Sequence, residues 1–348
     1  MRVVFAPDSF GGTLSAAQAA TAMAEGWSAG APHDAAEQIP LSDGGPGFVD
    51  VLASAHPDAE LIPVTVSDPL GRPVPATFLL TGDGTAYVES AQACGLHLLA
   101  EDERDPERTT TTGVGELLGA AVAAGARTVV VGLGGSATND GGQGLWEQLG
   151  GAWPAGVGLV AATDVNAPLL GHHGATAVFG PQKGASRAAL VRLEARMEAW
   201  ADELEAAAGR SVRGRDGAGG LGAALLALGG TREPGIQLVL DAVGLPARLD
   251  GAGAVVTGEG RFDAVSLRSK VPNGVARTAQ AAGVPCLVLA GLVEVGDREA
   301  RAAGFDAVHS TVALAGSPEE SRRRPDHWLR ELATRVARQW SPPHRNQG

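Results

Sequence analysis

Cysteine is scarce in this sequence, which has two among its 348 residues, Cys94 and Cys286. They lie far apart, and each sits in an apolar stretch. A disulfide framework or a zinc site needs more cysteines at closer spacing, so the sequence favours neither. We therefore expect both thiols to be reduced and buried.

Long apolar segments are also missing. No apolar run reaches the roughly 20 residues that a membrane-spanning helix needs. Residues 3–6 already read as a strand, and neither a basic region nor the long apolar run of a secretion signal precedes them. These features predict a cytoplasmic protein that does not enter a membrane.

Positive charge is the third shortage. The chain has 27 Lys and Arg residues against 39 Asp and Glu residues, which gives a net charge of −12 and a pI of about 5.1. A field of this sign repels phosphate backbones and anionic lipids, so we expect no nucleic-acid or membrane partner. We expect a small-molecule substrate, and an anionic one would need a local cluster of cations.

Lysine is rarer still. Of the 27 basic residues, two are lysines, Lys183 and Lys270, and the other 25 (27 − 2) are arginines. Where nearly all positive charge is carried by arginine, we expect the remaining lysines at positions that need a compact, flexible ammonium. Both lysines lie in segments rich in Gly and Pro, which favours a functional role over chance.

Short strands, glycine turns and helices alternate along much of the chain, as in parallel α/β sheets. This pattern predicts strands at residues 3–6, 127–132, 254–257 and 284–290, and helices at residues 15–28, 115–124, 187–208 and 273–282. Thr13 or Ser15 would cap the first of these helices.

Residues 61–88 differ, because short alternating runs joined by turn residues indicate antiparallel hairpins. We interpret this stretch as the entry into a second domain, for which 348 residues leave room. The predicted fold class is α/β. Residues 1–65 and 233–340 would form one discontinuous domain, residues 66–232 an inserted α/β domain, and residues 341–348 a flexible tail.

Two candidate site segments place an acid next to glycines. Residues 7–13 follow the first strand and include Asp8 and Ser9. Ligands of open α/β sheets bind at that end of the strands, where glycine N–H groups can hold an anion. Asp8 could also simply cap the turn. Asp43 precedes two glycines, which alone is a weak signal because Asp-Gly is common in plain turns.

The third segment, residues 132–142, directly follows a predicted strand. A long run of small and hydroxyl residues can wrap phosphates through backbone and hydroxyl hydrogen bonds. The nucleotide- or phosphate-binding candidates are Gly134, Gly135, Ser136, Thr138, Asn139 and Gly141. Asp140, in the same run, could help to hold a metal ion.

The remaining two segments carry the lysines. Asp164 follows an apolar run, and Lys183 lies shortly after it in residues 180–184. The other segment, residues 257–270, contains Glu259, Arg261, Asp263, Ser266 and Lys270. Acids and bases gathered beyond a strand end could hold Mg²⁺, phosphate and a carboxylate together, and a solvated loop of ion pairs is the alternative.

Two common nucleotide motifs do not fit. The sequence has no G-x-x-x-x-G-K-[ST] and so is not a P-loop protein. Gly217, Gly219 and Gly222 match G-x-G-x-x-G, but a polar loop precedes them where a dinucleotide-binding fold would have a strand.

Taken together, these segments resemble the type-1 glycerate kinases. The matches occur in the family's order over about residues 1–315, and the ordered set is specific although each piece is short. They are residues 6–10, 43–45, 110–117, 134–142, 164–165, 178–184, 217–222, 258–263 and 274–276.

The resemblance implies transfer of the ATP γ-phosphoryl group to D-glycerate with Mg²⁺, usually giving 2-phosphoglycerate. It also implies a Rossmann- or flavodoxin-like domain beside a second α/β domain, with the active site between them. It leaves the oligomeric state open, a homo-oligomer being one option.

Residue roles follow on this basis. The loop at residues 134–142 would hold the MgATP phosphates, with Asp140 and Asp263 as metal ligands. Lys183 and Lys270 would neutralise charge on the phosphoryl group or the substrate carboxylate. The substrate contacts would be Arg261, bidentate on the carboxylate, with Ser9, Glu259 and Ser266. The candidates for catalytic base and for metal ligation are Asp8, Asp43 and Asp164, of which Asp164 is our choice as base.

The chain departs from the family pattern at several positions. Gly11, Pro46 and Phe48 stand where the family typically has Lys, Glu and Thr, and the connection between Leu149 and Ala161 is shorter than usual. Loss of a lysine beside Asp8 removes a charge that could act on the substrate or phosphate. Two alternatives remain for such a chain: a kinase for another small hydroxy acid or polyol, and a non-catalytic ATP or metabolite sensor. A third, a nicotinamide-dependent dehydrogenase, rests only on the G-x-G-x-x-G match that begins at Gly217.

Overall fold

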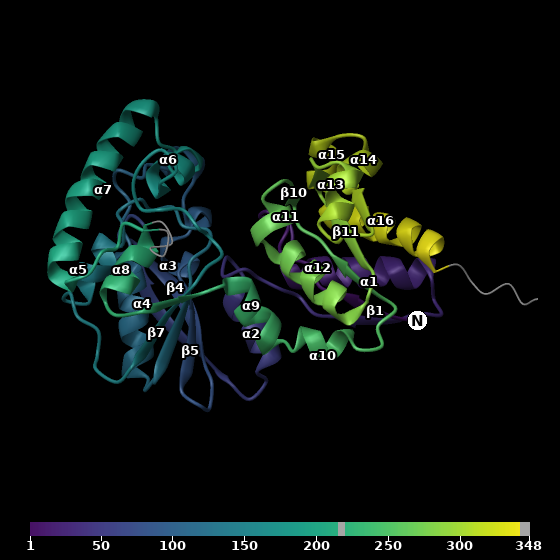
Figure 1. The fold of residues 1–348 in the computed structure, drawn as a ribbon, viewed down its shortest axis with the longest axis horizontal. Coiled ribbons are helices and arrows are strands. Elements are labelled where there is room, and N and C mark those ends of the chain that lie inside the picture. The colour runs from purple at the N-terminus through teal and green to yellow at the C-terminus, as the bar shows by residue number, and fades with distance from the viewer. Residues whose placement is uncertain (215–219, 342–348) are drawn as a thin grey trace, which may run out of the picture. The chain divides into compact units, whose positions relative to one another are not determined.

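The computed structural model describes residues 1–214 and 220–341, which form two compact units (Figure 1). Unit 1 comprises Met1–Ser42 and Ile236–Gly348, and unit 2 comprises Asp43–Gly235. The domain bounds predicted above differ from these units at residues 43–65 and 233–235. The largest difference arises because β3 (Glu60–Ser67) pairs along its length with β4 (Pro73–Leu80) and so belongs to the sheet of unit 2.

Unit 1 contains a five-stranded sheet in the order β13-β11-β9-β1-β2, with every neighbouring pair parallel. Counting only these five strands along the chain, the order is 2-1-3-4-5, which is the flavodoxin-like order. Their bounds are β1 Arg2–Phe5, β2 Ala35–Gln38, β9 Ala254–Thr257, β11 Cys286–Ala290 and β13 Ala307–Ser310. A separate pair is formed by β10 (Arg261–Phe262) and β12 (Leu292–Val293).

Helices bury the apolar strands of this sheet. On one side α1 (Ala16–Gly30) packs with α16 (Pro325–Trp340), and their apolar residues share a core with β1, β9 and β11. Ser15 begins α1 with a capping box that involves Gln18. The other helices of this part of the chain are α9 Gly235–Ala242, α10 Leu245–Leu249, α11 Ser266–Ser269, α12 Val271–Ala282, α13 Asp297–Ala302, α14 Thr311–Ala315 and α15 Pro318–Arg323.

Unit 2 contains a six-stranded sheet in the order β3-β4-β5-β6-β7-β8. Strands β3 to β5 are antiparallel neighbours, as the hairpin pattern predicts, and β5 to β8 run parallel. The remaining strands are β5 Thr85–Glu89, β6 Thr128–Gly132, β7 Gly158–Ala162 and β8 Thr231–Glu233. The carboxyl ends of β5 to β8 therefore share one edge, where the loops of interest begin.

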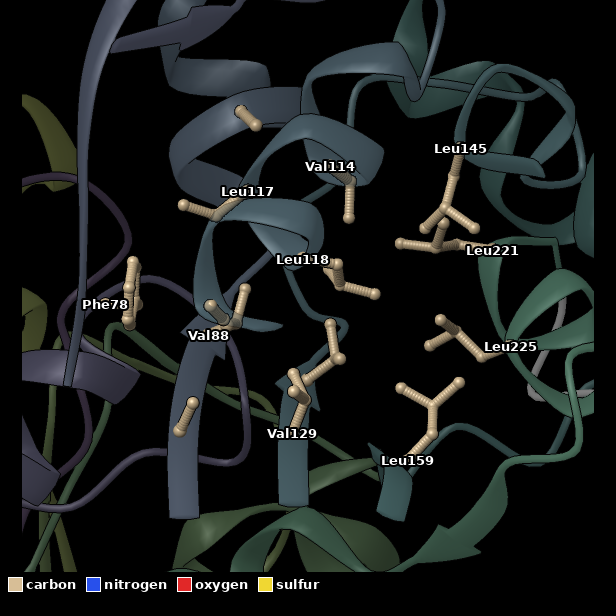
Figure 2. Packing of buried hydrophobic residues seen from close by; sticks show 14 of the residues in the cluster. Phe78, Val88, Val114, Leu117, Leu118, Val129, Leu145, Leu159, Leu221 and Leu225 are labelled. Carbon is tan, nitrogen blue, oxygen red and sulfur yellow. The ribbon is translucent and has the colours of Figure 1, made fainter. Parts of the chain in front are cut away.

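The core of unit 2 lies on one face of this sheet, under α4 (Thr112–Ala123) and α8 (Leu221–Ala227). Figure 2 shows Leu117 and Leu118 of α4 and Leu225 of α8 directed toward Val88, Val129 and Leu159 of the strands. On the opposite face, Phe48 of α2 (Phe48–Ala55) meets Tyr87 edge to face. The other helices are α3 Ala91–Cys94, η1 Leu96–Leu98, η2 Glu101–Glu103, α5 Gln143–Gln148, α6 Ala175–Phe179, η3 Pro181–Lys183 and α7 Arg187–Ala208.

The predicted α/β class and the flavodoxin-like sheet are confirmed. Both cysteines are free and buried, as expected. Among the helices of residues 1–214 and 220–341, none is long and apolar enough to cross a membrane. Residues 342–348 of the predicted tail lie outside the described residues.

Candidate functional site

A cavity of about 350 Å³ lies in unit 2 beside the loop that follows β6. Every residue predicted to bind nucleotide or phosphate lines it: Gly134, Gly135, Ser136, Thr138, Asn139 and Gly141. Asp140 and Lys183 line it too, whereas Leu96, Val165, Ala175, Phe179 and Leu221 give it an apolar side. The cavity can therefore take a molecule with an anionic end and an apolar end.

Lys183 is the cation of this cavity. Its side chain is buried in η3, where its Nζ donates hydrogen bonds to the Thr138 carbonyl and to Ser136 Oγ. Burial lowers the pKa of Lys183 to about 8. The field of the Asp140 carboxylate opposes this pKa shift, while the hydrogen bonds of the ammonium go to neutral groups. A buried ammonium with only neutral partners favours the arrival of an anion.

Asp140 holds the loop in shape. Its carboxylate accepts hydrogen bonds from the Thr111 N–H and hydroxyl, each at 2.8 Å, and from the N–H groups of Gly142 and Gly144. Four donors on one buried carboxylate account for its burial without a metal ion. The structure thus gives Asp140 a structural task, and its role as a metal ligand stays a prediction.

The segment with Asp43 packs backbone to backbone against this loop. Gly134 N–H donates to the Gly44 carbonyl at 3.0 Å, and a methyl group at Gly134 would lie 2.5 Å from Gly45 Cα. Any larger residue at 134 would therefore push the two segments apart. The Pro46 ring lies over Gly135, where a methyl group would be 2.9 Å from its Cγ and Cδ. Pro46 thus has a packing role at a position where the resembling family has Glu.

Asp164 follows β7 and lies near the Asp43 segment. Its neighbours Thr163 and Val165 line the cavity, while Asp164 does not. A methyl group built on Gly235 would lie 3.3 Å from Asp164 Oδ2 and 2.2 Å from the Asp43 carbonyl oxygen. The structure therefore brings two of the predicted acids to Gly235, and no side chain larger than hydrogen fits there without movement.

In unit 1, the other predicted residues gather where the strand order reverses. Asp8 and Ser9 follow β1, and Glu259 follows the adjacent β9. Asp8 N–H donates to the Gly258 carbonyl at 2.8 Å, and Ser9 N–H donates to Asp8 Oδ1 at 2.6 Å. In flavodoxin-like sheets, the carboxyl ends of these two strands are where ligands bind.

Glu259 and Lys270 form an ion pair beside this point. Lys270 Nζ lies 3.0 Å from Glu259 Oε2, and Glu259 is buried. Burial raises the pKa of Glu259, and the Lys270 ammonium opposes that shift. The predicted cluster of opposite charges thus exists within unit 1, with its cation already paired to a carboxylate.

Asp263 and Arg261 have other partners than the predicted ones. Asp263 Oδ1 accepts from the N–H groups of Val265 and Ser266, and so caps α11. Arg261 is exposed, and its Nε and Nη2 both donate to Glu294 on the β12 side of the β10-β12 pair. A carboxylate substrate would have to displace Glu294. The predicted metal role of Asp263 and substrate role of Arg261 therefore stay predictions.

No group of three or more His, Cys, Asp and Glu side chains that could hold a metal ion occurs in the described part of the chain. Of the G-x-G-x-x-G match, Gly217 and Gly219 lie outside the described residues, and Gly222 is buried in α8.

Sequence reasoning missed several residues of the site. Phe179 is the aromatic residue among the described cavity-lining side chains, and Gln182 lines the cavity next to Lys183. Glu89 is a buried acid at the end of β5. The signal for Glu89 was present in the sequence, because an acid ends a strand whose alternate residues, Ala86 and Val88, are apolar.

Known proteins of one family match this arrangement. The glycerate kinase family matches residues 3–154 and 152–341. A glycerate kinase of Bacillus subtilis is 39% identical over 97% of both chains, and glycerate 2-kinase of Escherichia coli is 36% identical over 93% of both chains.

A crystal structure of a proposed glycerate kinase 2 from Salmonella typhimurium LT2 superposes with a TM-score of 0.75 at 35% identity, covering 97% of this chain and 98% of that one. Since the family match spans both units and the relatives align nearly from end to end, the chain belongs to the glycerate kinase family.

Proposed function

We propose that this protein transfers the γ-phosphoryl group of ATP to D-glycerate and gives 2-phosphoglycerate. The observation that carries the proposal is the buried, cationic Lys183 in a cavity walled by glycine and hydroxyl residues. Family membership and relatives named as glycerate kinases support it, and the relative from E. coli named glycerate 2-kinase supports the 2-hydroxyl as acceptor.

The unit 2 cavity takes the nucleotide in this proposal. The loop at residues 134–141 and Lys183 bind the phosphates, and the apolar side with Phe179 receives the base. Phosphoryl transfer is accelerated chiefly by positioning and charge neutralisation, which a preformed loop and a buried ammonium supply. Gln182, on the same side as Lys183, is suited to hydrogen bonding with the base or ribose.

The residues of unit 1 recognise the acceptor in this proposal. Lys270 supplies positive charge for the glycerate carboxylate, with Glu259, Ser9 and Ser266 as hydrogen-bonding partners of its hydroxyl groups. Asp8 and Asp43 remain candidates for metal ligation or for acceptor binding.

The transfer itself needs one base. The 2-hydroxyl oxygen of glycerate attacks the γ-phosphorus, the bond from that phosphorus to the bridging oxygen of ADP breaks, and the hydroxyl proton passes to a carboxylate. Asp164 is our proposed base, because it follows β7 at the edge that also carries the phosphate loop.

Mg²⁺ would bind together with the nucleotide, and not as an ion held by protein side chains alone. Mg²⁺ commonly binds through phosphate oxygens, water and one or two carboxylates, and so does not require a group of three acidic side chains. Asp140 in unit 2 and Asp263 in unit 1 are each, separately, a proposed ligand. When bound, the ion neutralises charge on the phosphates.

The test is to mix the protein with ATP, Mg²⁺ and D-glycerate, follow ADP release, and identify the product by ³¹P NMR. Asp164→Asn should lower kcat at least 100-fold, and Asp250→Asn, which changes an exposed carboxylate, should not. Formation of 3-phosphoglycerate would correct the acceptor hydroxyl. ADP release only with another hydroxy acid or polyol would correct the substrate, and ATP binding without turnover on any acceptor would indicate a sensor.

A further inference from the structure

Glu89 is a buried carboxylate to which the proposed reaction assigns no task. It is the last residue of β5, and 5% of its surface is exposed. Side chains alternate along a strand, so Ala86 and Val88 point into the core under α4, whereas Tyr87 and Glu89 point to the face that α2 covers. Its position raises the question of what a charged group does beneath α2.

The contacts of Glu89 are with the start of α2. Its Oε2 accepts a hydrogen bond from Gly47 N–H at 2.9 Å and lies 3.5 Å from the N–H of Val49. Gly47 is the residue before the helix, and it provides no side-chain cap. Since the first N–H groups of a helix need acceptors, Glu89 supplies from 42 residues away the acceptor that the local sequence lacks.

The same strand end also borders the phosphate loop. Glu89 pairs in register with Gly132, the residue from which that loop departs, and Ser90 N–H donates to the Gly132 carbonyl at 3.0 Å. The residues just before Gly47 are the Asp43 segment, whose Gly44 carbonyl accepts from Gly134. Glu89 therefore lies between the anchor points of the two segments.

The charges around Glu89 do not stabilise its ionised form. Asp50 in the first turn of α2 is a like charge, and Asp43 starts the segment that leads into the helix. The titratable residue on the same face of its own strand is Tyr87, and the neighbouring strand β6 contains no charged residue. Burial, together with the Asp50 charge, raises the pKa of Glu89 to about 7. The hydrogen bonds from the N–H groups of Val49 and Gly47 lower this pKa and so limit the shift.

We propose that Glu89 is a positioning residue whose ionised carboxylate holds residues 43–47 against the loop at residues 132–142. The N–H groups of Gly47 and Val49 carry this contact, because an ionised carboxylate accepts from both more strongly than a neutral acid does. The expected effect on turnover rests on the proposed function. The expected effect on the α2 amides does not.

The first experiment measures kcat with saturating ATP and D-glycerate between pH 5.5 and 8.5. The wild-type protein should lose activity as the pH falls through about 7, with one proton taken up. Glu89→Gln should reduce kcat about tenfold at pH 8 and remove that acidic limb, with KM values changed less than threefold. Glu60→Gln, which alters an exposed carboxylate at the start of β3, should change neither. A Glu89→Gln protein with wild-type kcat and an unchanged limb would overturn the inference.

The second experiment measures hydrogen exchange of the amides at residues 44–52 at pH 8. In Glu89→Gln these amides should exchange at least tenfold faster than in the wild type, and in Glu60→Gln they should not. Unchanged exchange would overturn the inference whatever the activity. If the wild-type protein has no phosphotransfer activity but Glu89→Gln still exchanges these amides faster, the positioning role is supported and the proposed function is refuted. If Glu89→Gln does not fold, the wild-type protein still tests the inference. The protection of its amides at residues 44–52 against hydrogen exchange should fall below pH 7, where Glu89 becomes neutral. Protection that does not change with pH would overturn the inference.

Discussion

The two units hold their single lysines in opposite ways. In unit 1, Lys270 Nζ lies 3.0 Å from Glu259 Oε2, and 31% of its side chain is exposed. In unit 2, Lys183 is buried among neutral acceptors, the Thr138 carbonyl and Ser136 Oγ. One ammonium is ion-paired with a carboxylate, whereas the other hydrogen-bonds to neutral groups and feels the Asp140 carboxylate only through its field.

This difference indicates which unit takes the more highly charged ligand. A paired ammonium has part of its charge already compensated, so it suits a singly charged ligand better than a triphosphate. A buried ammonium that only neutral groups contact pays a desolvation penalty, and a phosphate oxygen would relieve it. The comparison therefore favours the proposed division, with the triphosphate in the cavity of unit 2 and the single carboxylate of glycerate at unit 1.

Removal of the Lys183 charge should have the largest effect. Lys183→Met keeps most of the apolar side chain and loses the ammonium, so we expect kcat to fall about a thousandfold, within the range that one transition-state charge supplies. Steady-state assays should show this loss with the protein still folded by circular dichroism. A decrease below tenfold would place the phosphates elsewhere and remove the distinction between the two lysines.

The pH dependence of stability should test whether burial of the Lys183 ammonium outweighs the field of the Asp140 carboxylate. Its folded pKa of about 8 is below the ordinary value of 10.5, so the unfolded chain binds more protons between those values. The Lys183 contribution to the free energy of unfolding should therefore rise from about pH 8 to pH 10.5. Urea titrations of wild type and Lys183→Met should diverge in that window, and parallel curves would contradict the assignment.

The second largest effect should follow from breaking the Lys270–Glu259 pair. Lys270→Met leaves the buried Glu259 carboxylate without this cation, which we expect to cost about 2–3 kcal/mol of unfolding free energy. The double variant with Glu259→Gln should recover most of that stability. If the double variant is stable but its KM for glycerate stays at least tenfold raised, the Lys270–Glu259 pair binds the substrate; if KM also recovers, the role of the pair is structural.

Local sequence signals were enough for much of the fold. The predicted strand at residues 254–257 and helix at residues 187–208 coincide with β9 and α7, because apolar runs and helical spacing depend on near neighbours. The choice between Thr13 and Ser15 as cap was resolved by the structure, where Ser15 Oγ accepts from the Gln18 N–H. The glycine-rich loop was also recognisable, since its composition is local.

Partners from distant parts of the chain could not be predicted. The partner of Arg261 in the structure is Glu294, 33 residues further on, which spacing did not predict and which the pairing of β10 with β12 brings near. The donors to Asp140 include Thr111, 29 residues away, and the donors to Glu89 include Gly47, 42 residues away. Such contacts depend on strand order and register, which residue spacing alone does not determine.

A moderate effect should appear at the apolar side of the unit 2 cavity. Phe179→Ala removes its aromatic ring, and the loss of one stacking contact with the base should raise KM for ATP about tenfold. KM for glycerate should change less than twofold. Val178→Ala is the matched control, because Val178 precedes it in α6 and is exposed. Equal changes in both KM values would show that the two ligands do not divide between the units as proposed.

The smallest effect should come from Arg261, whose charge is compensated at the surface. Its side chain is 63% exposed, and its Nη2 lies 2.6 Å from Glu294 Oε2. An exposed ion pair of this kind contributes about 0–1 kcal/mol, so Arg261→Ala and Glu294→Ala should each lower the free energy of unfolding by less than about 1 kcal/mol. Urea titrations would measure this loss, and KM for glycerate should stay within twofold of wild type in both. A KM raised at least tenfold in Arg261→Ala but not in Glu294→Ala would identify Arg261 as the carboxylate ligand. Unit 1 would then, like unit 2, rely on a cation that changes partner when the substrate binds.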